Sequence, residues 1–168
     1  MEENSTLARA RLQSAQYRRF ATGLLVGLSV LVLFERLSAV GMKLSTDGFS
    51  SEWARRLGYQ LTAACPEVFY LVALWGIRQA LASIALGKPF APAITRMMNL
   101  VGTMLAIGAI INVLVVPGIA WALGFGMGYL IAYDVSGLVL GAIGLSLKVF
   151  SHLLQHAGEL QSELEEIF

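Results

Sequence analysis

Long apolar stretches separated by short polar segments are the main feature of the hydropathy pattern. The stretches cover residues 20–42, 57–78, 97–116 and 126–148. A helix that crosses the ~30 Å hydrocarbon core of a bilayer needs about 20 mainly apolar residues. The four stretches have about this length, so the sequence predicts an all-α integral membrane bundle of four transmembrane helices.

Two of these boundaries depend on single residues. The first stretch is free of charge only as far as Phe34, so we expect Glu35 and Arg36 to lie at the far membrane interface. No charged residue occurs over residues 97–133, which is too long for one span, and proline interrupts helices. We therefore expect Pro117 to end the third span.

The composition supports lipid as the surrounding medium. The chain is 57% hydrophobic and 14% charged, whereas a soluble domain carries roughly 25% charged residues. A net charge of +1 gives no reason to expect nucleic-acid binding. The single cysteine, Cys65, lies inside an apolar stretch, so we expect it to pack in the bundle rather than to form a disulfide.

The distribution of Lys and Arg predicts the orientation, because cytoplasmic loops and tails carry more of them. Eight of the 12 fall on one predicted side (Arg9, Arg11, Arg18, Arg19, Arg78, Lys88, Arg96, Lys148) and four on the other (Arg36, Lys43, Arg55, Arg56). Both termini are therefore predicted to be cytoplasmic. Residues 1–19 then form a basic tail, residues 20–150 the transmembrane domain, and residues 151–168 an acidic amphipathic helix.

Two carboxylates lie inside the predicted spans. At 1.5 Å per residue, Glu67 lies ~16 Å and Asp134 ~21 Å from the inner interface. An acid at such depth is costly unless it is paired, protonated or hydrated. One interpretation is a site that binds a proton or cation, with Asn112 beside it. The other is a set of structural groups, hydrogen-bonded to Asn112, Tyr133 or an outer-loop arginine.

Small residues line one face of the fourth span. Gly137, Gly141 and Gly144 share this face with Asp134 and Lys148, by the three- and four-residue spacing of a helix. Glycines let membrane helices approach closely. The sequence therefore predicts that this face points into the bundle.

Sets of residues typical of enzymes are missing from the sequence. His152, His156 and Glu159 share a helical face, but no fourth metal ligand accompanies them. Neither a phosphate-binding P-loop nor a serine nucleophile motif occurs. We expect no catalytic activity, no cofactor and no metal.

Apolar residues of the acidic tail follow the heptad spacing of a coiled-coil seam. The seam consists of Leu153, Ala157, Leu160, Leu164 and Ile167. About two heptads are too short to be stable alone in water, so the seam needs a partner. The basic N-terminal tail of the same chain or of a second copy is one candidate. The alternatives are a soluble cytoplasmic protein, with the arginines on anionic lipid, or unstructured tails.

The turn between spans two and three carries a resemblance. It contains Gly87, Pro89 and Phe90, and it is followed by Arg96 and Gly102. In these residues, and in Asp134 near the start of span four, the chain resembles the bacterial membrane family called domain of unknown function 2975. Family members often have Ser or Thr after the Phe, where this chain has Ala91.

The resemblance implies four spans in the bacterial inner membrane. Members are often encoded beside small helix-turn-helix regulators, which implies a soluble cytoplasmic regulator as partner. The combined prediction is a non-enzymatic multi-pass protein that contacts membrane lipid and binds a partner, or its own copies, at its cytoplasmic surface. The alternative is a small oligomeric proton- or cation-coupled transporter or channel that uses Glu67 and Asp134.

Overall fold

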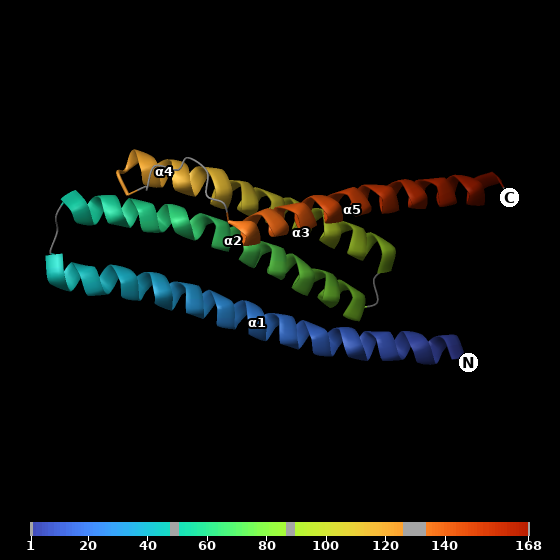
Figure 1. Cartoon of the computed structure of the whole chain (residues 1–168). Helices are drawn as coiled ribbons and strands as arrows, with labels where there is room; N and C mark the ends of the chain where they lie inside the picture. Colours follow the sequence, from blue (N-terminus) through green and yellow to red (C-terminus); the bar gives the residue numbers. More distant parts are fainter. Residues whose placement is uncertain (1, 48–50, 87–89, 126–133, 168) are drawn as a thin grey trace.

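The protein is a row of long helices (Figure 1). In the computed structural model, the described residues are 2–47, 51–86, 90–125 and 134–167, and the side chains near both termini and the turns are excluded. The elements are α1 (Glu2–Asp47), α2 (Ser51–Ala85), α3 (Phe90–Ile110), the π-helical turn η1 (Ile111–Val115), α4 (Val116–Ala122) and α5 (Val135–Ile167). Strands are absent from these described ranges.

In the described ranges, four helices have the length and apolar composition needed to cross a membrane, as the sequence predicts. Their apolar spans are Gln16–Ser38, Ser51–Ala85, Pro92–Ala122 and Val135–Leu160. Large apolar side chains cover their outer surfaces, such as Phe20 and Phe34 of α1, which are 68% and 73% exposed. In a membrane these surfaces face lipid, which removes the cost of leaving them uncovered. The chain is therefore an all-helical, multi-pass membrane protein.

The helices pack in chain order. Among the described residues, α1 contacts only α2, α2 contacts α3, and α5 packs along α3. The N and C termini lie at the same end of the row, on opposite sides of it (Figure 1). We call this end the terminal end. Since α1 and α5 make no contact in the described part of the chain, the predicted pairing of the two tails within one chain is not observed.

Glycines let the backbones of α3 and α5 approach closely. A Cβ atom added to Gly102 would lie 2.5 Å from the carbonyl oxygen of Gly144 and 2.9 Å from the amide nitrogen of Lys148. A Cβ atom on Gly144 would lie 2.7 Å from the carbonyl oxygen of Gly102, and one on Gly141 would lie 3.0 Å from the Cβ atom of Ala109. The predicted inward direction of the α5 glycine face is therefore confirmed.

The expectation that Pro117 ends the third span is wrong. The helical path continues through η1 and α4 as far as Ala122. Pro117 lies in the first turn of α4, where its missing N–H is tolerated, and the π turn before it shifts the hydrogen-bond register. Gly124 ends the helix instead, with a φ of 76°. The Gly124 N–H donates to Trp121 and the Phe125 N–H to Ala120, which is a Schellman motif.

Other predicted boundaries also shift. The sequence predicts that the fourth span begins at residue 126, whereas its described helix begins at Val135; residues 126–133 lie outside the described ranges. Neither tail is separated from the bundle, because α1 and α5 continue without a break through residues 19–20 and 150–151. Cys65 is exposed at the lipid-facing surface rather than packed.

Candidate functional site

An ion pair between Arg36 and Glu67 joins α1 to α2. Nη2 of Arg36 contacts Oε1 of Glu67, and its Nε donates to Oε2 at 3.4 Å. The same guanidinium donates to Oε1 of Gln60 at 2.6 Å and to the carbonyl of Ala63 at 3.4 Å. The two charged side chains are 23% and 30% exposed. Glu67 is thus held by an arginine from the C-terminal half of α1.

A second polar contact sets the register of α1 on α2. Nε of Arg78 donates to Oγ1 of Thr22 at 2.9 Å, and this hydroxyl donates to the carbonyl of Arg18 at 2.8 Å. Thr22 and Arg36 are 14 residues apart on α1, which corresponds to ~21 Å of helix. Because the two contacts are far apart, they fix both the axial position and the rotation of α1.

Asp134 caps the N-terminus of α5. Its Oδ1 accepts the Ser136 N–H at 3.0 Å, and its Oδ2 accepts the Gly137 N–H at 3.1 Å. Oδ2 also accepts the side-chain amide of Asn112 at 2.7 Å. Asn112 lies in η1, so the π turn presents the amide to the start of α5. A carboxylate at a helix N-terminus is stabilised by the helix dipole as well as by these hydrogen bonds.

The structure does not bring Glu67 and Asp134 together. Glu67 lies between α1 and α2, whereas Asp134 lies between η1 and α5. On α2, one turn after Glu67, the ring of Tyr70 packs against Gly108 of α3. The Tyr70 hydroxyl is buried and has no hydrogen-bond partner among the described residues. Asn112 therefore joins Asp134 alone, and the three predicted polar residues do not form one site.

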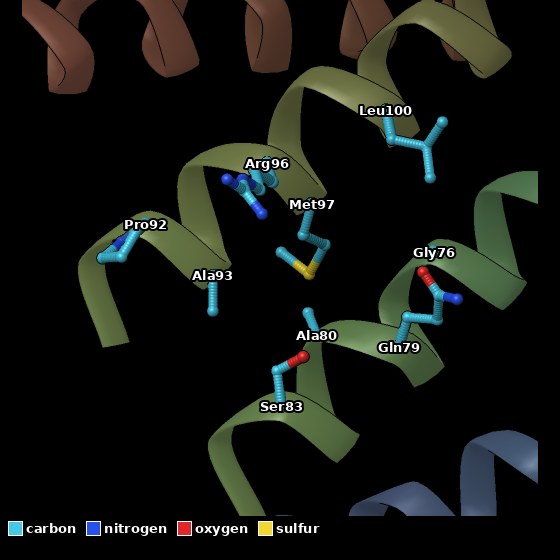
Figure 2. A pocket seen from close by; sticks show the side chains of 9 residues that line it. All are labelled: Gly76, Gln79, Ala80, Ser83, Pro92, Ala93, Arg96, Met97 and Leu100. Carbon is cyan, nitrogen blue, oxygen red and sulfur yellow. The ribbon is translucent and has the colours of Figure 1, made fainter. Parts of the chain in front are cut away.

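A pocket opens between α2 and α3 near the terminal end of the bundle (Figure 2). Its volume is about 310 Å³. Gln79 and Ser83 line it from α2, and Arg96 lines it from α3. Arg96 is exposed and has no hydrogen bond or ion pair within the described residues. Of the turn residues with which the resemblance began, Arg96 lines this pocket, Phe90 begins α3, and Gly87 and Pro89 lie outside the described ranges.

The predicted partner-binding seam lies on the part of α5 that runs on toward the C-terminus. Leu153 and Leu160 are 57% and 61% exposed, and Ala157 is exposed as well. The side chains of Leu164 and Ile167 fall outside the described set, although their backbone is helical. The last buried residue before the seam is Ser151, whose hydroxyl donates to the carbonyl of Thr95 at 2.9 Å.

Sequence reasoning missed several polar contacts of these helices. Ser151 follows Gly144 by seven residues, so it shares the packed glycine face, and this spacing would have identified it. The spacing of residues along one helix gives no sign that Gln60 joins Arg36. The described residues contain no group of three His, Cys, Asp or Glu side chains able to hold a metal. His156 instead contacts Glu159 at 3.1 Å.

Comparison with known proteins places most of the chain in a family. Neither the curated proteins nor the solved structures contain a match to this chain. A family model described as "Protein of unknown function (DUF2975)" matches residues 53–167. The matched region contains η1, α3, α4 and α5, nearly all of α2, and the pocket that Arg96 lines, whereas α1 precedes it. The chain therefore belongs to the DUF2975 family.

Proposed function

We propose that this protein is a non-enzymatic membrane protein that binds a soluble cytoplasmic protein through the C-terminal part of α5. The supporting observation is that α5 continues as one helix to Ile167 and is exposed on all sides from residue 152 to residue 160. A helix that leaves the bundle with exposed leucines is typical of a binding surface. By the excess of Lys and Arg near the terminal end, this surface lies in the cytoplasm of a bacterial cell.

Charge indicates which kind of partner fits. The segment from residue 151 to the C-terminus carries four glutamates and no Lys or Arg. Its seam, from Leu153 to Ile167, is apolar. A complementary partner is therefore an amphipathic helix with an apolar stripe and basic flanks, since opposite charges beside a seam favour pairing. The basic start of α1 in a second copy has the same chemistry, so the experiment must distinguish a foreign protein from a second copy.

The transporter alternative has less support. Arg36, which also donates to Gln60, pairs with Glu67, and Asn112 with two backbone amides binds Asp134. These contacts satisfy each carboxylate within a separate helix interface. Such contacts are typical of groups that hold helices together in a membrane.

The test uses the tagged full-length protein, purified from native membranes after mild crosslinking, with bound proteins quantified by mass spectrometry. The double variant Leu153→Ser with Leu160→Ser removes two seam residues. We expect it to recover at least tenfold less of a specific soluble protein, since losing even one buried apolar anchor of about 2 kcal/mol weakens binding roughly 30-fold. The matched control is Leu154→Ser, which changes an exposed leucine beside the seam, and recovery should stay within twofold.

The recovered protein must also show the expected chemistry. Neutralising the basic flank of its amphipathic helix should weaken binding in a direct assay with the purified proteins. If the seam variant recovers the same proteins as the wild type, the proposal is wrong. If seam-dependent crosslinks join only copies of this chain, the surface serves assembly and the soluble partner is excluded.

A further inference from the structure

The pocket between α2 and α3 has a different character from the exposed α5 surface. It has a cation at one side, two polar groups on the facing helix, and apolar walls (Figure 2). From its position and lining we propose that it binds the phosphate of an anionic phospholipid headgroup, with Arg96 as the main contact. This inference is independent of the partner proposed for α5.

Arg96 has no competing partner among the residues that the structure describes. Within the described part of the chain, Arg96 forms neither an ion pair nor a hydrogen bond, and no Asp or Glu lines the pocket. A guanidinium binds phosphate through two parallel N–H groups, which makes arginine well suited to this ligand. Gln79 and Ser83 add an amide and a hydroxyl from the α2 wall. Without an acidic group to attract a choline or ethanolamine, the lining favours a headgroup with net negative charge.

The position of the pocket along α2 places it near the level of lipid headgroups. Arg78, which contacts Thr22, is the first Lys or Arg on α2 after Arg56, so it marks the end of the long part of this helix that has no Lys or Arg. Gln79 and Ser83 follow it toward the terminal end. Basic pockets between membrane helices at the cytoplasmic interface are typical sites for anionic lipid headgroups.

The pocket is apolar at the end that faces the membrane interior. Gly76 and Leu100 line this end, and Ser83 and Ala93 line the other (Figure 2). A Cβ atom on Gly76 would lie 2.7 Å from Cδ2 of Leu100, so the glycine allows the two helices to approach there. From Gly76 to Ser83 the helix rises about 10 Å. A phospholipid in this leaflet has its phosphate at the membrane surface and its glycerol and acyl chains toward the interior. The polar and apolar ends of the pocket follow the same order.

The size of the pocket also fits part of a lipid rather than a bare ion. A volume of about 310 Å³ lies at the lower end of the range of roughly 300–1,000 Å³ for small-molecule sites. Inorganic phosphate would satisfy Arg96 but leave the apolar end beside Gly76 and Leu100 unfilled. The glycerol and upper acyl segments of a phospholipid would cover that surface.

The experiment measures binding to the purified full-length protein by native mass spectrometry. The probes are phosphatidylglycerol, phosphatidylcholine and inorganic phosphate. We expect one phosphatidylglycerol site with at least tenfold higher affinity than phosphatidylcholine. Arg96→Gln should weaken this site about tenfold, because a hydrogen bond to a charged group contributes about 1.5 kcal/mol or more. Ala93→Leu narrows the pocket without changing its charge and should weaken binding similarly.

The control is Arg19→Gln, which removes an exposed cation of α1 at the same end of the bundle. It should change phosphatidylglycerol affinity by less than twofold. Equal losses in Arg19→Gln and Arg96→Gln would indicate a general charge effect and overturn the proposal. So would equal affinity for the two lipids. If inorganic phosphate binds as tightly as phosphatidylglycerol and depends on Arg96, the ligand is free phosphate and the lipid assignment is wrong.

Discussion

Arg36→Met lowers the free energy of unfolding by about 3 kcal/mol in our expectation, because it leaves the Glu67 carboxylate without its partner. Arg36 supplies the ion pair and also the contacts to Gln60 and Ala63. An unpaired acid among membrane helices must be protonated, hydrated or exposed to lipid, and each of these costs free energy. The measurement is reversible unfolding of the purified protein in bicelles.

The double variant separates the ion pair from the fold. Arg36→Met with Glu67→Met should recover most of the lost stability, since replacing both ions by apolar groups removes the desolvation cost. Arg19→Met is the control, because Arg19 is exposed and lies on the same helix; it should change stability by less than 0.5 kcal/mol. If the double variant is as unstable as Arg36→Met, the loss has another cause than an unpaired Glu67.

Gly102→Ala is the second substitution with a large expected effect. Its methyl group would lie 2.5 Å from the carbonyl oxygen of Gly144 and 2.9 Å from the amide nitrogen of Lys148. Both are backbone atoms, so α3 and α5 must move apart, and we expect a loss of about 2–3 kcal/mol. The same bicelle unfolding assay measures it.

Gly27→Ala is the matched control for Gly102→Ala. Nothing lies within 4 Å of a Cβ atom added to Gly27, which is on α1. Alanine also forms helices better than glycine. The variant should therefore be as stable as the wild type or slightly more stable. Equal losses for the two substitutions would contradict the assigned contact between α3 and α5.

The sequence predicts the helices of this protein better than their ends. Length and apolar composition were enough to find four spans, because lipid imposes both. The predicted end of the third span, at Pro117, is wrong because proline is tolerated in the first turn of a helix that follows a π turn. Gly124 carried the correct signal, since a glycine with positive φ commonly ends a helix. The glycine face of α5 was predictable because its spacing is regular within one helix.

The polar contacts were less predictable, because they join residues from different helices. Counting residues along each span predicts similar membrane depths for Glu67 and Asp134. Membrane depth alone does not tell which pair of helices a side chain lies between. The rotation of α2 directs Glu67 to α1, while Asp134 contacts Asn112 of η1 and the first turn of α5. The pocket beside Arg96 also depends on how α2 and α3 pack. Such arrangements follow from tertiary packing rather than from the pattern along one helix.

We infer that the helices cross the membrane four times, and we propose that both ends lie in the cytoplasm. Single cysteines at Ser5, Ser45, Leu86, Leu123 and Ser162, introduced after Cys65→Ala, test this topology with a membrane-impermeant thiol reagent on spheroplasts and inverted vesicles. We expect the cysteines at positions 5, 86 and 162 to react only in inverted vesicles, and those at 45 and 123 to react only in spheroplasts. Labelling of positions 5 and 162 from opposite sides would contradict this topology.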